Sequence, residues 1–343
     1  MMDPPPGLFV RAVARIASGL LPLSKARPAE IRRVLVVRTD DRVGNALLTI
    51  PLVRALQRAL PLARVDLLLA GNRAALAEGL PGLSIVRFEK QDSFLHPYRF
   101  LKFLNRLRAA DYDVVLDAAH WHSFSLTSAL LSRWAARKWL IGHDRGAIYS
   151  ETVPLPAPGV PEIAAKVALG APLGAGVAPP METALGRRPS PVEGRFAAMN
   201  PGARKSDHRW PASQFGALAR ALQEKFHLAS VMFWGPGEEA IAREAVNASG
   251  GAARLAPRTD LDELAAALRA SVLAVTNDTG PMHLAVACGA PVVALFLDEA
   301  GLRWAHPGPA FAAVVAPAGI GPVLEAASRL LDSARGAAEP PRL

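Results

Sequence analysis

The chain contains two regions in which short apolar runs alternate with amphipathic segments. The first opens with the apolar run "VLVV", which is followed by the helical pattern "GNALLTIPLVRALQRALP" and later by "YDVVLDAA". In the second, "LASVMFWG" follows the helical pattern "PASQFGALARALQEKF", and the apolar run "APVVALF" comes further on. Strands that alternate with helices form parallel sheets covered on both faces. The pattern predicts an α/β protein with two Rossmann-like domains whose parallel sheets face a central cleft.

A change of composition separates the two regions. Proline and glycine become frequent in residues 151–194, where a short helical pattern stands near Ile163–Leu169. Such a composition is typical of a connecting segment. The sequence therefore divides into an N-terminal segment (1–33), a first domain (34–150), an interdomain segment (151–194) and a second domain (195–335).

The composition favours an anionic partner. The chain of 343 residues is 51% hydrophobic, enough to fill two domain cores, and carries a formal net charge of +9. A basic protein attracts nucleotides, phosphorylated glycans or anionic membranes, although the arginine usage of a GC-rich genome would give the same charge. No nucleic-acid-binding motif is recognisable, so we expect no nucleic-acid partner. The single cysteine, Cys288, excludes a disulfide within the chain and indicates a reducing compartment.

Residues 1–33 have the pattern of a basic amphipathic helix. No apolar run in the sequence is long enough to span a bilayer, and arginines interrupt the apolar stretch of this segment, which argues against a signal peptide. On a helix, the apolar residues share one face and the arginines lie elsewhere: Phe9, Val13, Ile16 and Leu20 against Arg11 and Arg15. This pattern is typical of a helix on an anionic membrane surface. Packing on the protein's own body is the alternative.

The stretch "TNDTGPMHLAVACGAPVVALF" places small and polar residues between a strand and a helix. Asp278, Thr279 and Gly280 would form the helix N-terminus, where unpaired N–H groups bind phosphate. Gly280 would let a phosphate approach the backbone, and Asn277 and His283 stand on either side. We expect an anion site here. Ordinary helix capping beside a buried histidine is the alternative.

Two further loops follow strands of the second domain. "NPGARKSDHRWP" gathers Lys205, His208 and Arg209 before a helix, a cluster that would clamp a diphosphate. In "FWGPGEE", Gly235 starts a tight turn, and Glu238 would accept hydrogen bonds from a ribose. Ligands bind at the carboxyl ends of parallel strands, so we expect these loops to line one site. A solvated basic loop and an acidic first helical turn are the alternatives.

These three loops, in this order, resemble glycosyltransferase family 9, the heptosyltransferases of lipopolysaccharide assembly. The family pattern has a loop like N-P-G-A…K-R-W-P, a G-G-P-x-E turn and the run N-D-T-G-P-M-H-x-A-x-A-x-G-x-P-x-V-x-L-F. This chain has "NPGARKSDHRWP", "WGPGE" and "NDTGPMHLAVACGAPVVALF". In the first half, "VLVVRTDDRVGNALLTIPLVRAL" and "IGHDRG" also look like the family. The resemblance covers about Val34–Leu331.

The resemblance implies a GT-B fold and an inverting glycosyltransferase that uses no metal or other cofactor. Residues 195–335 would bind a nucleotide sugar, typically ADP-heptose, and residues 34–150 would face an acidic glycolipid or saccharide acceptor. The implied location is the cytoplasm, with residues 1–33 on the inner face of the cytoplasmic membrane. The implied donor residues are Lys205, His208, Arg209, Gly235, Glu238, Asn277, Asp278, Thr279, Gly280 and His283.

The chain departs from the family at the proposed general base. Members have Gly-Asp at the start of the first helix, whereas this chain has Gly44-Asn45, and an amide cannot take a proton. Asp41 is our first choice for a replacement base, and Asp40 in the same loop is another. Alternatively, Asn45 only positions the acceptor, or Asp41 merely pairs with Arg42 in a turn. A non-catalytic family member is the remaining interpretation.

Asp117 and His120 follow another strand of the first domain. They would shape the acceptor pocket or simply pack. The stretch "HWH" that contains His120 has no carboxylate or cysteine partner at a useful spacing, so we expect no metal site. Two rival functions would share the donor loops: a sugar-nucleotide epimerase and a non-catalytic nucleotide-sugar-binding protein.

Overall fold

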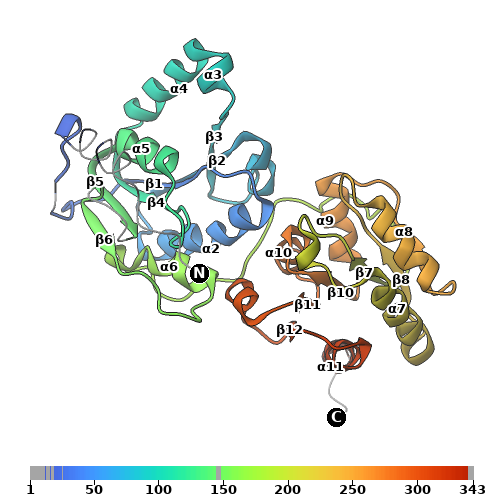
Figure 1. Ribbon diagram of the computed structural model, residues 1–343. Helices are drawn as coiled ribbons and strands as arrows, with labels where there is room; N and C mark the ends of the chain where they lie inside the picture. The colour runs from blue at the N-terminus through green and yellow to red at the C-terminus, as the bar shows by residue number, and fades with distance from the viewer. Residues whose placement is uncertain (1–11, 13–15, 17–18, 25, 144–147, 339–343) are drawn as a thin grey trace. The chain divides into compact units, whose positions relative to one another are not determined.

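The computed structural model describes residues 12, 16, 19–24, 26–143 and 148–338, with the backbone alone for His208 and for 334–338 (Figure 1). The chain forms two compact units, Met1–Met181 and Glu182–Leu343. Each unit has its own parallel sheet, so the two are described separately.

A six-stranded parallel sheet forms the centre of the first unit, in the order β3-β2-β1-β4-β5-β6. The central strand β1 is a run of aliphatic residues because helices cover both faces, and its Val36 pairs with Leu67 of β2 and Leu116 of β4. The strands are β1 (Arg33–Arg38), β2 (Arg64–Ala70), β3 (Ser84–Phe88), β4 (Tyr112–Asp117), β5 (Ala136–His143) and β6 (Glu151–Val153). The helices, among which η marks a 3-10 helix, are α2 (Val43–Ala59), η1 (Gly71–Leu76), α3 (Asp92–Leu95), α4 (Pro97–Ala109), α5 (Leu126–Ala135), α6 (Glu162–Ala168) and η2 (Ala171–Leu173).

The second unit is built around another six-stranded parallel sheet, in the order β12-β11-β10-β7-β8-β9. Leu273 and Val275 of β10 belong to the core shared with α7 and α11, whereas Ala274 and Thr276 point to α9 and α10. The strands are β7 (Phe196–Asn200), β8 (Ala229–Met232), β9 (Ala253–Leu255), β10 (Leu273–Asn277), β11 (Val292–Phe296) and β12 (Phe311–Val315). The helices are η3 (Ser206–His208), α7 (Ala212–Phe226), α8 (Glu239–Ala248), α9 (Leu261–Ala270), α10 (Gly280–Ala287), η4 (Glu299–Trp304) and α11 (Ile320–Ala338).

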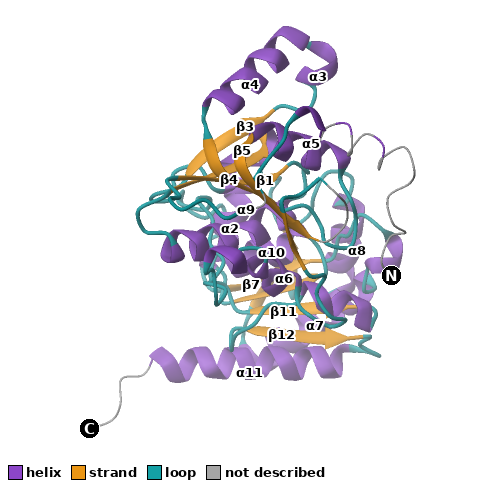
Figure 2. Ribbon diagram, turned by 90° about the vertical axis from the view of Figure 1, so that its left-hand side faces the viewer, coloured by secondary structure: helices purple, strands orange, loops and turns teal. Residues whose placement is uncertain are grey.

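The two sheets share one topology, and Figure 2 shows their strands in orange among the helices. Renumbered within its own unit, the second sheet has the doubly wound order 3-2-1-4-5-6 of the first. The strand order therefore reverses between β1 and β4 in one unit and between β7 and β10 in the other. Ligands bind at such reversals, beyond the carboxyl ends of the strands. The predicted α/β architecture with two parallel sheets is confirmed.

Part of the predicted interdomain segment folds with the first unit. β6 pairs in parallel with β5, with Glu151 opposite Ile141, and α6 packs against α2. Ile163 and Val167 of α6 are buried, and the units divide after Met181. The division after Met181 falls within residues 151–194, and proline and glycine shape surface turns as readily as linkers.

The predicted amphipathic segment 1–33 lies largely outside the described residues, and Phe9, Val13, Arg11 and Arg15 are among those left out. Ile16 and Leu20 are described, and both are exposed. Membrane binding by this segment stays a prediction. Along the described chain, no helix has the length and apolar character needed to cross a bilayer.

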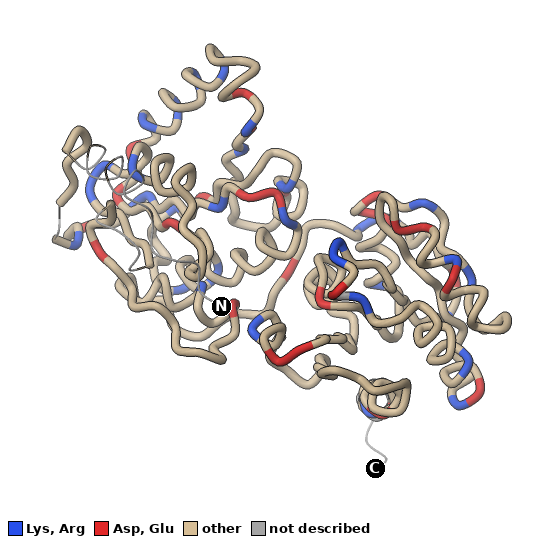
Figure 3. The backbone as a smooth tube through the Cα atoms, viewed as in Figure 1, with Lys and Arg blue, Asp and Glu red and all other residues tan. Residues whose placement is uncertain are grey.

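Cations recur along α4, as Figure 3 shows.

Gly216 allows a close approach of α7 and α8, and this contact generates a stability prediction. A Cβ atom built on Gly216 would lie 2.7 Å from the backbone oxygen of Ala245 and from the Cβ of Ala248. Gly216→Ala should therefore lower the free energy of unfolding by about 1–3 kcal/mol in urea denaturation. Gly321→Ala in α11 is the matched control, since no described atom outside its chain neighbours and its own helix backbone lies within 4 Å of its added Cβ. Equal stability of the Gly216→Ala variant and the unsubstituted chain would contradict the close packing.

Candidate functional site

A buried asparagine joins two loops at the strand-order reversal of the second unit. Asn277 ends β10 with no exposed surface, and its Oδ1 accepts the Trp210 N–H at 3.0 Å. Its Nδ2 donates to the carbonyl oxygens of Pro201 at 3.0 Å and Gly202 at 3.3 Å. The amide therefore holds the loop after β7 beside the loop after β10. The sequence analysis assigned Asn277 to donor binding, whereas in the structure its side chain bonds the protein backbone and holds the two loops together.

The helix α10 begins in the same place. Thr279 is its N-cap with extended backbone, Gly280 is its first residue, and Pro281 lies in the first turn. The Thr279 hydroxyl donates to the Asn277 carbonyl at 3.2 Å and makes no capping hydrogen bond to the helix. The first N–H groups of α10 are thus not taken by the N-cap side chain. Such groups, with the helix dipole behind them, suit an anion.

His283 lies inside the fold behind this helix end. Its side chain is 5% exposed, and its Nδ1 lies 2.7 Å from Nε2 of His306. Burial lowers the pKa of His306 to about 4, so that ring is neutral near pH 7. The sequence placed His283 within reach of a ligand, and the structure gives it a buried histidine partner. His306 lies just after η4, in a stretch that no motif indicated.

The structure describes two of the three predicted side chains in the basic loop after β7, those of Lys205 and Arg209. Lys205 is exposed at the start of η3, and Arg209 donates from Nε to the Ala203 carbonyl at 2.7 Å. That bond folds the loop back toward β7. The side chain of His208 lies outside the described residues. Lys205 and Arg209 therefore carry positive charge into the loop that Asn277 fixes.

The loop after β8 packs against the loop after β7. Glu238 accepts the Gly235 N–H at 3.1 Å, and a Cβ atom built on Gly202 would meet the Glu238 carboxylate at 2.2 Å. The carboxylate can occupy this place only because residue 202 has no side chain. Since β8, β7 and β10 are neighbours in the sheet, the three predicted loops lie side by side.

Asp278 is a partly buried carboxyl group beside charges of both signs. Burial raises the pKa of Asp278 to about 7, Arg303 opposes this shift, and Asp298 adds to it. Arg303 belongs to η4 after β11, and its guanidinium lies over the Trp304 ring at 5.1 Å. A carboxyl group that is half protonated near pH 7 repels an anion less than an ordinary aspartate does. The sequence indicated Asp278 but missed Arg303.

A second polar group lies at the strand-order reversal of the first unit. Arg38 ends β1 with 1% exposure, pairs through Nε with the Asp40 carboxylate and donates to the Ala118 carbonyl at 2.6 Å. Asn45 of α2 donates from Nδ2 to Asp40 Oδ1 at 2.8 Å, and the same nitrogen lies 2.9 Å from His120 Nε2. The loops after β1 and β4 meet here because these strands are neighbours.

His120 stands between donors on one side and a carboxylate on the other. Its Nε2 lies 2.7 Å from Arg38 Nη2, and its Nδ1 lies 3.1 Å from Glu162 Oε1. Burial, with the Arg38 charge behind it, lowers the pKa of His120 to about 3, so the ring is neutral. Because Arg38 and Asn45 both point N–H groups at Nε2, that nitrogen accepts and Nδ1 donates to Glu162.

Glu162 and Lys166 of α6 complete this network. Glu162 is fully buried, accepts the Trp121 indole N–H at 2.6 Å and pairs with Lys166 at 3.2 Å. Burial would raise the pKa of Glu162, but the Lys166 charge and the hydrogen bond from His120 hold it below its ordinary value. Burial and the Arg38 charge lower the pKa of Lys166 to about 8. Both residues lie in the stretch that the sequence assigned to the interdomain segment.

The remaining predicted residues of the first unit divide into buried and exposed ones. Asp117 accepts hydrogen bonds from Ser128 Oγ at 2.6 Å and Tyr149 Oη at 2.8 Å, and burial raises its pKa. Gly44 is buried in the first turn of α2, whereas Asp41 and Arg42 are exposed. Asp117 thus supports the loop after β4 from inside the fold.

The structure also supplies a carboxylate to the "HWH" stretch. One ligand atom each of His120, His122 and Glu162 lies within 4.8 Å of the others, a spacing that would suit a metal ion. The sequence offered no such partner, because Glu162 is distant along the chain. Lys166 and Arg38, however, touch the carboxylate and the His120 ring directly. Two cations at the ligand atoms fit a hydrogen-bonded network better than a metal site, and the absence of a metal stays a prediction.

Comparisons with known proteins show the family and the fold of the chain. The family described as "Glycosyltransferase family 9 (heptosyltransferase)" matches residues 100–316. Lipopolysaccharide heptosyltransferase 3 of Escherichia coli (strain K12) is 25% identical over 279 residues, which are 74% of this chain and 79% of that protein. Among solved structures, E. coli heptosyltransferase WaaC with ADP has a TM-score of 0.68 at 20% identity, covering 88% of this chain and 99% of its own. E. coli ADP-heptose lps heptosyltransferase II has a TM-score of 0.62 at 22% identity, with 88% and 99% covered.

The raised pKa of Asp278 generates a prediction about pH and stability. Folding holds the proton on this carboxyl group, so its contribution to stability is fully present near pH 4 and is lost as pH rises toward 7. Asp278→Asn removes this loss. The free energy of unfolding of the variant, relative to that of the unsubstituted chain, should therefore be higher at pH 8 than at pH 5 by roughly 2 kcal/mol. Urea unfolding at both pH values measures the difference. The exposed Asp207→Asn serves as the control, and a pH-independent effect of Asp278→Asn would contradict the buried carboxyl group.

Proposed function

Because the chain belongs to glycosyltransferase family 9, the heptosyltransferases, we propose that it transfers a heptose or a similar sugar from ADP-heptose to a saccharide acceptor of the lipopolysaccharide core. The observation that carries the proposal is that Asn277 joins the loops after β7 and β10, with the loop after β8 packed against the first of them. The related proteins named above, one solved with ADP and one described as an ADP-heptose enzyme, support the choice of nucleotide.

The proposed donor site uses charge on two sides of a diphosphate. The N–H groups at Thr279 and Gly280 face it from the start of α10, and Lys205 and Arg209 approach from the loop after β7. Gly280 has no side chain to keep a phosphate away. Fixed donors of this kind stabilise the negative charge that develops on a leaving diphosphate, so the proposed reaction needs no metal ion. Glu238 is proposed to accept a hydrogen bond from the ribose.

The proposed reaction is a single displacement that inverts the anomeric centre. The acceptor hydroxyl oxygen forms a bond to the anomeric carbon as the bond from that carbon to the diphosphate breaks. The diphosphate leaves with the bonding electron pair, and the hydroxyl proton passes to a base. Asn45, at the family's position for this base, has an amide that accepts no such proton.

Asp40 is the proposed base because its carboxylate lies directly beside Asn45. Asn45 donates to its Oδ1 at 2.8 Å, and Arg38 pairs with its other oxygen. Burial would raise the pKa of Asp40, but the Arg38 charge and the Asn45 hydrogen bond hold it below its ordinary value, so the group is ionised. The single lone pair of His120 Nε2 already faces Arg38 and Asn45, whereas each carboxylate oxygen of Asp40 has a second lone pair that can take a proton. Asp41, our first choice from the sequence, is exposed and not joined to Asn45 by any hydrogen bond of the described residues.

Calorimetric titration tests the donor site. The protein should bind ADP and ADP-heptose about tenfold or more tightly than UDP or GDP, with or without magnesium, since the proposed diphosphate contacts are all protein groups. Lys205→Ala should weaken ADP binding about tenfold, because it removes a charged contact, and the exposed Lys225→Ala is the control. A preference for UDP would overturn the proposed donor. Absence of binding to any nucleotide would favour a non-catalytic protein.

Transfer assays with ADP-heptose and lipopolysaccharide core acceptors test the base. Asp40→Asn should lower kcat about 10²–10⁴-fold with little change in the KM for the donor, because a base acts on the chemical step. Asp41→Asn should retain activity. Asn45→Asp, combined with Asp40→Asn, should restore part of the lost kcat by returning a carboxylate to the neighbouring position. Loss of activity in Asp41→Asn with retention in Asp40→Asn would contradict the assignment.

A further inference from the structure

The segment 92–109, which contains α3 and α4 and is called the α3–α4 arm below, exposes large apolar side chains. Figures 1 and 2 show the arm extending away from the sheet beyond the end of β3. The exposed fractions are 82% for Phe94, 67% for Leu95, 78% for Tyr98 and 57% for Leu101. Side chains of this size are normally scattered singly over a soluble surface, whereas here four fall within one short stretch.

These exposed residues are not the ones that attach the arm to the unit. Phe100, Phe103 and Leu104 pack against the core of the first unit, and Leu107 is buried within it. Phe103 lies 5.7 Å from the ring of Phe88 at the end of β3. In a helix, Tyr98 and Leu101 project on the side opposite Phe103 and Leu107. The arm therefore has an inner apolar face that fixes it and an outer apolar surface that nothing in the described chain covers.

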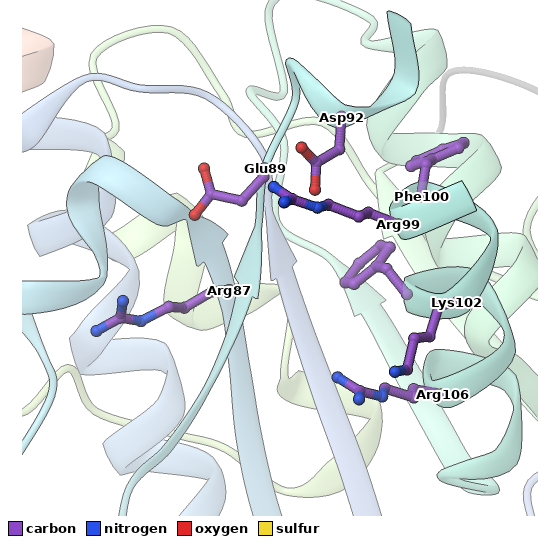
Figure 4. Close-up of a pocket in the computed structure, with 8 residues that line it drawn as sticks. Arg87, Glu89, Asp92, Arg99, Phe100, Lys102 and Arg106 are labelled. Atoms are coloured by element: carbon purple, nitrogen blue, oxygen red, sulfur yellow. The ribbon is translucent and has the colours of Figure 1, made fainter. Parts of the chain in front are cut away.

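Positive side chains stand next to the outer apolar surface. A pocket of about 300 Å³ between β3 and α4 is lined by Arg99, Lys102 and Arg106 of α4, together with Arg87. Figure 4 shows the three α4 side chains reaching into this space, with the carboxylates of Glu89 and Asp92 near Arg99. Arg87 is already paired with Glu78 at 2.5 Å. From Phe94 to Ala109 the sequence contains four arginines or lysines and no acidic residue.

We propose that the α3–α4 arm docks the protein on an anionic phospholipid bilayer. Phe94, Leu95, Tyr98 and Leu101 enter the headgroup region, and Arg99, Lys102 and Arg106 contact lipid phosphates. The combination of exposed aromatic and aliphatic side chains with flanking cations fits a membrane surface, where long basic side chains reach the headgroups while apolar ones insert. Protein interfaces are depleted in lysine at their apolar centres, so a protein partner fits this surface less well. The proposal rests on the arm alone and does not depend on the transfer reaction.

Sedimentation of the full chain with lipid vesicles tests the apolar contribution. The protein should bind vesicles of phosphatidylcholine mixed with phosphatidylglycerol, and the combined variant Phe94→Ser, Leu95→Ser, Leu101→Ser should lose about tenfold or more of that binding. Leu62→Ser with Val177→Ser is the matched control, because these side chains are 95% and 88% exposed elsewhere in the first unit. Urea unfolding should be unchanged in both variants, since none of the five residues is part of a core.

The charge contribution needs a second variant. Arg99→Gln, Lys102→Gln and Arg106→Gln together should remove the preference for phosphatidylglycerol and the weakening of binding by salt, whereas exposed Arg254→Gln with Arg258→Gln should not. Equal binding to pure phosphatidylcholine, no vesicle binding by the full chain, or vesicle binding that survives both arm variants would overturn the proposal. Self-association that is lost in the apolar variant, measured by analytical ultracentrifugation without vesicles, would instead assign the arm to contacts between copies.

Discussion

The reversal of strand order in each sheet is the constraint on which both groups of polar residues depend. It makes β10 a neighbour of β7, and β4 a neighbour of β1, although each pair is separated by two strands in the sequence. In the second unit the amide of Asn277 uses this proximity, since one buried side chain holds the loop after β7 to the end of β10. The hydrogen bonds of that amide place the positive loop beside the start of α10.

In the first unit, the reversal between β1 and β4 brings together buried groups of opposite charge. Arg38 and Lys166 are buried cations that pair directly with the carboxylates of Asp40 and Glu162. Asn45 and His120 link the two pairs by hydrogen bonds. Breaking such a network leaves an uncompensated buried charge, which is far more costly than losing a surface ion pair. Asn45 fits this network because its amide nitrogen donates to Asp40 and lies beside His120 Nε2. An aspartate at position 45 would instead place a second carboxylate beside that of Asp40.

Much of the fold and the positions of the three loops in the second unit could be predicted from the sequence because the signals are local. The apolar runs gave the strands, and the motif residues after β7, β8 and β10 followed directly from the positions of strand ends. The partnership of Glu162 with His120 could not be predicted, because it joins α6 to a loop 42 residues away and α6 lies in a proline-rich stretch. His283 and Asn277 were recognised as part of the motif, but their use in the framework depends on His306 and Trp210, which only the folded chain brings near.

Hydrogen–deuterium exchange of the full chain with and without ADP tests the central claim, that the loops held together at the β7–β10 reversal form the nucleotide site. We expect ADP to slow exchange in peptides covering residues 201–210, 235–238 and 278–283, because the ligand would take up the N–H groups at the start of α10 and order the two neighbouring loops. Peptides covering the α3–α4 arm should be unaffected. Protection confined to residues 38–45 and 117–123, with none in the three loops of the second unit, would contradict the account.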